Sequence, residues 1–150
     1  MTEYIEVNVG DLKGPALDWA VAHATHAWEW AHNWFPTMTL DPNFSGVSDD
    51  GRGKDGAIVL VPRNPMRQEP QEFRPTIDWN QGGRLIEEHG IKIERSSNGC
   101  TWYAGWLIPG IGWNSQHQMW DGETPLEAAC RAIVDCKLGN EIKVPRQLLP

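Results

Sequence analysis

Residues 124–139 read TPLEAACRAIVDCKLG and predict a helix with both of its ends marked. Thr124 is a typical N-cap, Pro125 suits the first turn, and Glu127 completes a capping box three residues after the threonine. Gly139 ends the helix, because glycine readily takes the left-handed conformation of a helix C-terminus. The apolar face of this helix consists of Leu126, Ala129, Cys130, Ile133 and Val134.

The N-terminal part of the chain predicts a strand followed by a long helix. Ile5, Val7 and Val9 alternate with polar residues, which is typical of a half-buried strand. The helix is predicted from Pro15 to Trp34, ended by Pro36. Its apolar stripe consists of Leu17, Val21, Ala24, Trp28, Ala31 and Phe35.

A second stripe on the same predicted helix combines two aromatic rings with two imidazoles. Its members are Trp19, His23, His26 and Trp30. The two histidines could ligate a metal, but the sequence supplies no evident third ligand, so we predict no metal site and no cofactor. We interpret the stripe as a partly buried face, with a ligand-facing or homo-oligomer-facing surface as the alternative.

The remaining elements are short. Residues 36–56 are rich in Pro, Gly, Ser and Asp, and residues 63–75 contain three prolines. They predict an irregular loop or insertion over about 36–75, interrupted by a buried strand at 57–61. A short helix is expected over 84–89, and strands before and after the hairpin signal at 96–99. A last edge strand includes Ile142 and Val144. We therefore predict an α+β fold with a small, mostly antiparallel sheet packed with two longer helices and one short helix.

Composition and charge indicate the number of domains, the kind of core and the partners to expect. Residues 1–150 suggest a single domain, and nine tryptophans predict a tryptophan-rich core, with some rings lining a ligand or partner surface as the alternative. The formal charge of −7 argues against a long nucleic acid partner, because phosphate backbones are bound by clustered Lys and Arg. Without a membrane-spanning apolar run, a signal segment or a disulfide pattern, we expect no membrane partner and a cytoplasmic location.

The sequence contains no recognisable catalytic set. It has neither a nucleophile elbow nor a phosphate-binding loop. Nothing marks Cys100, Cys130 or Cys136 as activated, and all three occur in strand or helix contexts that predict burial. We therefore predict binding without catalysis, and a nucleotide-processing enzyme is the least favoured function.

Residues 76–83, which read TIDWNQGG, are the best candidate for a binding site. Polar side chains, a flat ring and bare backbone N–H groups would converge there at a helix N-terminus. The ring could stack on a nucleobase while the carboxamides read its edge, so the predicted ligand is nucleotide-like. The predicted ligand-binding residues are Thr76, Asp78, Trp79, Asn80, Gln81, Gly82, Gly83 and Arg84, with Trp19 as the nearest partner from the first long helix.

The same stretch has a purely structural interpretation, which the sequence leaves open. Thr76 or Asp78 would cap the helix, Trp79 would fill the core, and the two glycines would allow the helix to pack closely.

Three blocks of sequence resemble a known family. They are GPALDWAVA at 14–22, TIDWNQGG at 76–83, and a C-terminal block at 122–145 that contains TPLEAA, KLG and VP. In this combination they resemble the NinX-like family of small bacteriophage and prophage proteins. Arg84 stands where a proline is common in that family, and residues 36–70 do not match.

The resemblance implies a phage accessory protein rather than a capsid or tail part, and it implies no established activity. Phages encode small non-enzymatic proteins that sequester host nucleotide signals or block host defence proteins, and by that analogy the stretch at 76–84 suits sequestration of a nucleotide-like ligand. The alternative is a protein–protein interaction module that inhibits or modulates a host or phage protein. Exposed tryptophans would then anchor the contact, and the negative surface would face a basic partner.

Overall fold

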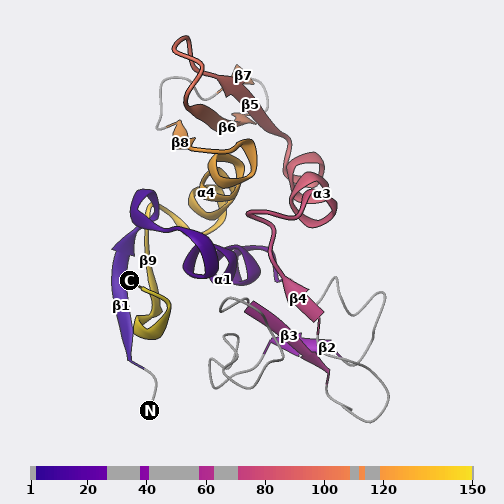
Figure 1. The fold of residues 1–150 in the computed structure, drawn as a ribbon, viewed down its shortest axis with the longest axis vertical. Coiled ribbons are helices and arrows are strands. Elements are labelled where there is room, and N and C mark those ends of the chain that lie inside the picture. The colour runs from indigo at the N-terminus through magenta and orange to yellow at the C-terminus, as the bar shows by residue number, and fades with distance from the viewer. Residues whose placement is uncertain are drawn as a thin grey trace.

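The computed structural model describes residues 3–26, 38–40, 58–62, 71–108, 112–113 and 119–149. Within these residues, three α-helices pack with short antiparallel sheets, which confirms the predicted α+β fold (Figure 1). Two 3-10 turns, at Val9–Asp11 and Arg146–Leu148, follow the first and last strands.

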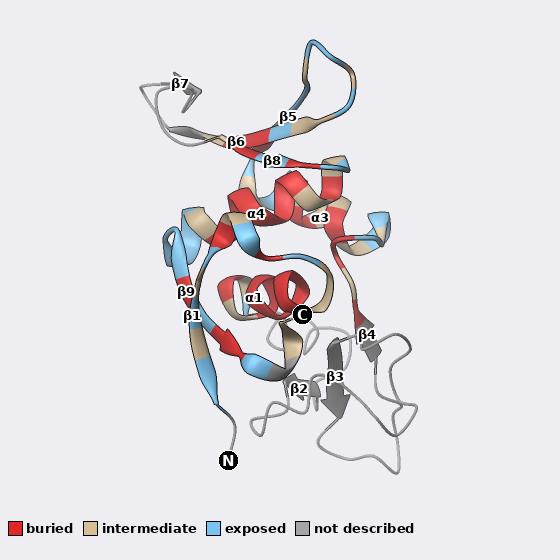
Figure 2. Ribbon diagram, turned by 60° about the vertical axis from the view of Figure 1, so that its left-hand side comes forward, coloured by how far each residue is buried: buried red, intermediate tan, exposed pale blue. Residues whose placement is uncertain are grey.

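Helix α4 (Pro125–Leu138) lies at the centre of the fold. Its predicted start is confirmed, since Thr124 Oγ1 accepts a hydrogen bond from the N–H of Glu127 at 3.1 Å. Its predicted end is also confirmed, because Gly139 follows it with a φ of 93°. Figure 2 shows α4 and α1 largely buried between the surrounding strands. The largest fully buried side chains that α4 adds to the core are Ile133 and Val134.

Helix α1 (Gly14–Thr25) is shorter than predicted. His26 takes the left-handed conformation at a φ of 51° and its N–H caps the helix, so the prediction of one helix reaching Trp34 is wrong. An apolar stripe reports which face is buried but not where the backbone leaves the helical conformation. The last part of that stripe, including Trp28, lies outside the described residues. In the second stripe, Trp19 is buried and His23 is half-buried, as predicted, whereas His26 is exposed. Trp30 lies outside the described residues.

Helix α3 (Trp79–His89) begins five residues earlier than predicted. Asp78 is its N-cap, and its side chain accepts a hydrogen bond from the N–H of Asn80 at 2.8 Å. The pair of glycines that was expected to precede the helix therefore lies inside it. Gly90 ends α3 as predicted, with a φ of 61°.

The first and last strands form a sheet of their own. β1 (Tyr4–Asn8) pairs antiparallel with β9 (Glu141–Pro145), which places Ile5 opposite Val144. This confirms the N-terminal strand and the last strand predicted from the sequence. The sheet lies beside α1 in Figure 1.

The second sheet is built around β6 (Trp102–Ile108). β6 pairs antiparallel with β5 (Ile91–Arg95), β7 (Gly112–Trp113) and β8 (Trp120–Gly122). Residues 96–99 connect β5 to β6, as their turn signal predicted. α4 and α3 pack against this sheet.

A three-stranded antiparallel sheet occurs within the segment predicted as an irregular loop. Its strands are β2 (Met38–Leu40), β3 (Ile58–Pro62) and β4 (Gln71–Phe73). The apolar run predicted β3, but β2 and β4 are only three residues long, too short to show a periodic pattern. Phe73 is fully buried and connects β4 to the main core.

Candidate functional site

The segment that leads into α3 is fixed to α1 through a buried carboxyl group. Asp18 is 3% exposed, and its Oδ1 accepts a hydrogen bond from the N–H of Thr76 at 3.0 Å. Thr76 is buried as well, and the N-cap of α3 is Asp78. The predicted helix cap is therefore present at Asp78, while Thr76 is buried and hydrogen-bonded to α1.

Two further residues of the predicted site contact the protein itself. Gln81 Oε1 accepts a hydrogen bond from the N–H of Arg74 at 2.6 Å. Gly82 packs so closely that an added Cβ would collide with the carbonyl oxygen of Pro75 and lie 2.6 Å from Leu126 Cδ2. Close packing of α3 therefore requires a glycine at this position, as the structural interpretation of the segment predicted.

Trp79 and its neighbours are directed to solvent. Trp79 is 58% exposed and Ile77 is 60% exposed, and Asn80 is exposed beside them. The expectation that Trp79 fills the core, which belonged to the structural interpretation, is wrong. A Cβ added to Gly83 would lie 3.7 Å from Trp79 Cε3, so the ring lies near this glycine, one turn further along α3. An exposed ring and an exposed carboxamide therefore remain available at the start of the helix.

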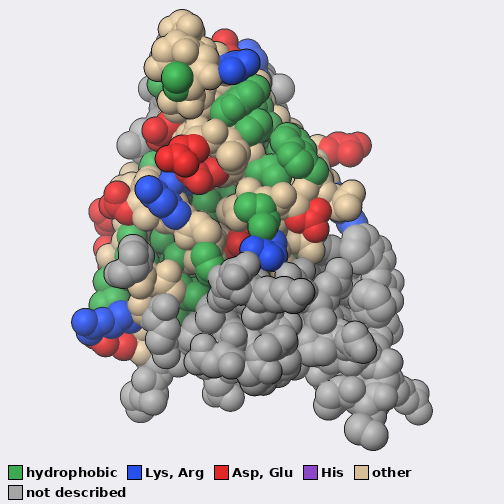
Figure 3. Space-filling model, viewed as in Figure 1, with side chains coloured by type: hydrophobic (Ala, Val, Ile, Leu, Met, Phe, Trp, Pro, Cys, Tyr) green, Lys and Arg blue, Asp and Glu red, His purple; other side chains and the backbone are tan. Residues whose placement is uncertain are grey.

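Charged side chains lie further along α3. Arg84 Nε donates to Glu88 Oε1 at 2.9 Å, and both side chains are partly exposed. Glu87 is exposed next to them. On the face seen in Figure 3, hydrophobic side chains gather over the second sheet and α3, with acidic side chains around them.

Trp19 lies elsewhere in the fold. Its ring centroid is 4.0 Å from that of His23 and 6.1 Å from that of Tyr4, and it lines a separate cleft beside β9. Adjacent residues of a helix point about 100° apart, so Asp18 rather than Trp19 is directed toward the Thr76 segment. The sequence-based placement of Trp19 next to this segment is corrected accordingly.

The Asp18 carboxyl group has an unusual acidity. Burial raises its pKa to about 7, although the hydrogen bonds from Thr76 and the charge of Arg74 both oppose the shift. The sequence analysis did not single out Asp18, although a carboxylate within an apolar helix was a visible signal. His23, by contrast, has a lowered pKa because of burial and the nearby charge of His26.

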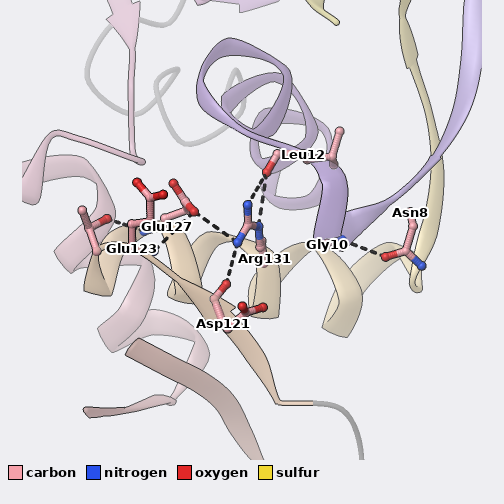
Figure 4. Close-up of polar contacts among 8 residues, drawn as sticks. Asn8, Gly10, Leu12, Asp121, Glu123, Glu127 and Arg131 are labelled. Atoms are coloured by element: carbon pink, nitrogen blue, oxygen red, sulfur yellow. Dashed lines mark hydrogen bonds and ion pairs between the residues drawn. The ribbon is translucent and has the colours of Figure 1, made fainter. Parts of the chain in front are cut away.

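A second polar cluster, also missed from the sequence, surrounds the buried Arg131 (Figure 4). Its guanidinium donates to the carbonyl oxygens of Leu12 and Asp121 and pairs with Glu127 at 3.1 Å. The cluster borders a cavity of about 230 Å³ that Lys13 also lines. These contacts connect the segment that precedes α1 to α4 and β8, so the principal role of Arg131 is structural.

The three cysteines differ in their exposure to solvent. Cys130 is buried, and burial raises the pKa of its thiol well above the ordinary value. Cys100 and Cys136 are exposed, which corrects the expectation that all three cysteines are buried. Across the described residues, His, Cys, Asp and Glu form no group of three placed to hold a metal ion, and no helix is long and apolar enough to cross a membrane.

Comparison with known proteins assigns the chain to a family. None of the curated proteins compared with it matches. The family model described as "Bacteriophage P22, NinX" matches residues 8–137, a span that contains α1, α3 and nearly all of α4. The chain therefore belongs to the NinX family of bacteriophage P22.

Proposed function

We propose that this bacteriophage protein acts by binding a partner protein, through the surface that Ile77 and Trp79 form at the start of α3. The observation that carries the proposal is the exposure of these two large apolar side chains, two residues apart in the chain. Aromatic side chains are prominent among the residues that dominate binding energy in protein interfaces, so an exposed tryptophan on a rigid helix suits such a role.

The charge of the protein favours a basic partner. The chain has a formal charge of −7, and Asp78, Glu87 and Glu88 belong to the same segment as Trp79. Complementary charge increases the association rate and disfavours partners of the same sign. The partner that this surface fits has an apolar pocket surrounded by Lys and Arg side chains.

A nucleotide-like ligand, such as a host defence signal, is the second candidate. It is favoured by the exposed Trp79 ring, which offers a stacking face, and by the exposed carboxamide of Asn80 and the partly exposed Arg84 on the same helix. The partner protein is favoured over it because Thr76, Gln81 and Gly82, which were expected to contact the ligand, make contacts within the chain.

Native mass spectrometry of the protein purified gently from phage-infected cells tests both candidates. Trp79→Ala would be compared with Tyr103→Ala, which removes an aromatic ring that is 37% exposed on β6. We expect a bound protein that is lost with Trp79→Ala and kept with Tyr103→Ala. A bound nucleotide with the same dependence on Trp79 would establish the second candidate instead.

The proposed binding surface is rejected if the bound species, of either kind, is unaffected by Trp79→Ala, or if the purified protein is folded and free of any bound species.

A further inference from the structure

A cleft of about 340 Å³ borders one edge of β9. It is lined by Trp19, His23, Leu138, Glu141, Ile142 and Lys143. Successive side chains of a strand point to opposite faces, so a cleft that touches three consecutive strand residues runs along the edge of that strand. β1 is described along its whole length and contributes no lining residue, so the cleft follows the edge of β9 that does not pair with β1. We call this the open edge.

The pairing of β9 with β1 determines which backbone groups reach the open edge. The N–H of Val9 donates to the carbonyl of Asn140, and the N–H of Arg146 donates to the carbonyl of Glu3, each at 2.9 Å. Antiparallel hydrogen-bonded pairs alternate along a strand, so Glu141 and Lys143 direct their N–H and C=O groups away from β1. Within the described residues, β1 is the one strand that pairs with β9.

The sequence of the open edge is complementary to itself when it is read in the opposite direction. Glu141, Ile142 and Lys143 follow one another as acid, apolar residue and base. If two copies of β9 run antiparallel and are centred on Ile142, Glu141 of each copy lies opposite Lys143 of the other. The two Ile142 side chains then lie opposite each other beside the apolar cleft. Each residue that offers free backbone groups thereby meets another such residue, as an antiparallel ladder requires.

We propose that two copies of this chain associate through the open edges of β9, forming a continuous four-stranded antiparallel sheet in the order β1, β9, β9 and β1. The association is two-fold symmetric, so the same surface of each copy is used. Glu141 of one copy pairs with Lys143 of the partner copy, and this pair occurs twice. Pro145 has no N–H group and therefore limits the ladder to the residues around Ile142.

The cleft supplies the apolar part of this interface. Trp19 is 7% exposed and Ile142 is 8% exposed, whereas Leu138, at 45%, remains largely open at the end of α4. Exposed charges at a strand edge also protect monomers from unwanted pairing. If the charges served only to protect the monomer, exchanging an acid for a base would not change the association of two copies. If they pair across an interface, the same exchange would weaken it.

Charge reversal at single positions tests the proposal. Glu141→Lys gives an edge with two bases, and Lys143→Glu gives an edge with two acids. Each variant alone would place like charges opposite each other, so we expect sedimentation equilibrium to show dimerisation weakened by about tenfold or more for both. An equimolar mixture of the two variants restores complementarity, and we expect a heterodimer with near wild-type affinity.

Two controls accompany the mixture. Lys137→Glu makes the same charge change on α4 at a residue that does not line the cleft, and it should dimerise like the wild type. Trp79→Ala should also leave the dimer intact, because this proposal is independent of the surface on α3. Native mass spectrometry gives the mass of each mixed species.

A wild-type protein that stays monomeric up to millimolar concentration would overturn the proposal. So would a dimer that neither single reversal weakens, or one that the mixture does not restore, because the contact would then lie elsewhere on the surface or with a different partner.

Discussion

The N–H of Thr76 donates a hydrogen bond to Oδ1 of Asp18 across 3.0 Å, and these residues are 58 positions apart in the chain. The contact joins the middle of α1 to the turn that precedes α3. Since Gly82 of α3 packs against Pro75 in the same turn and against Leu126 of α4, one buried junction holds three helices together. It also fixes the position of the exposed Trp79.

We expect the stability of the protein to fall as the pH rises through the pKa of the Asp18 carboxyl group. Burial raises the pKa of Asp18 from 3.8 to about 7, so the folded state keeps a proton that the unfolded chain releases. The protonated carboxyl group contributes about 4 kcal/mol to the free energy of unfolding. This contribution is fully present below pH about 4 and is lost as the pH rises through about 7. Urea unfolding at intervals between pH 4 and 8 measures the change.

Asp18→Asn provides the control, because its amide oxygen can accept the same hydrogen bond while remaining uncharged at every pH. We expect the variant to lose most of this pH dependence and to be more stable than the wild type at pH 8. Equal pH profiles for the two proteins would show that Asp18 does not titrate in this range.

Two adjacent glycines of α3 should respond oppositely to alanine. In Gly82→Ala the new methyl group would collide with the backbone of Pro75, so we expect a loss of about 2 kcal/mol or more. In Gly83→Ala the methyl group meets Trp79 at an ordinary contact distance of 3.7 Å, and the better helix propensity of alanine should stabilise the protein by about 0.5–1 kcal/mol. Thermal unfolding of both variants under one condition tests the contrast, which fails if the two changes agree in sign.

Substitutions of an exposed and a buried tryptophan should differ in their effect on stability. Trp79→Ala removes an exposed side chain, and we expect the stability to change by less than about 0.5 kcal/mol. Trp120→Phe removes a buried N–H that donates to Asp135 at 3.0 Å and leaves a smaller ring, at an expected cost of about 1–2 kcal/mol. Guanidinium unfolding measures both, and a large loss for Trp79→Ala would mean that its ring supports the fold.

Local signals made part of the fold predictable. The N-cap at Thr124, the glycine stop at Gly139 and the turn at 96–99 each act within a few residues, and all three are found where they were predicted. The start of α3 was missed because the helix was expected to begin after the glycine pair, although Asp78, one of the two caps considered, supplies the N-cap. The end of α1 was missed because the apolar stripe carries no signal for the left-handed His26.

The candidate site was harder to predict because its contacts are distant in sequence. The segment itself was recognised from its composition, but composition cannot show which side chains the protein uses internally. Thr76 is bonded to α1 and Gly82 is packed against α4, and both partners come from other helices. The exposure of Trp79 follows from these contacts, since they determine which side of α3 faces the core.

Arg131 should be among the most important polar residues for stability. Its side chain is 5% exposed, and it bonds to the Leu12 and Asp121 carbonyl oxygens and to Glu127. Arg131→Met would leave these acceptors without their buried donor, so we expect a loss of about 3 kcal/mol in urea unfolding. Arg146→Met is the matched control, because the ion pair of Arg146 with Glu3 is exposed on both sides and should contribute less than about 1 kcal/mol. If the two variants lose equal stability, the buried cluster does not connect α1 to α4 energetically.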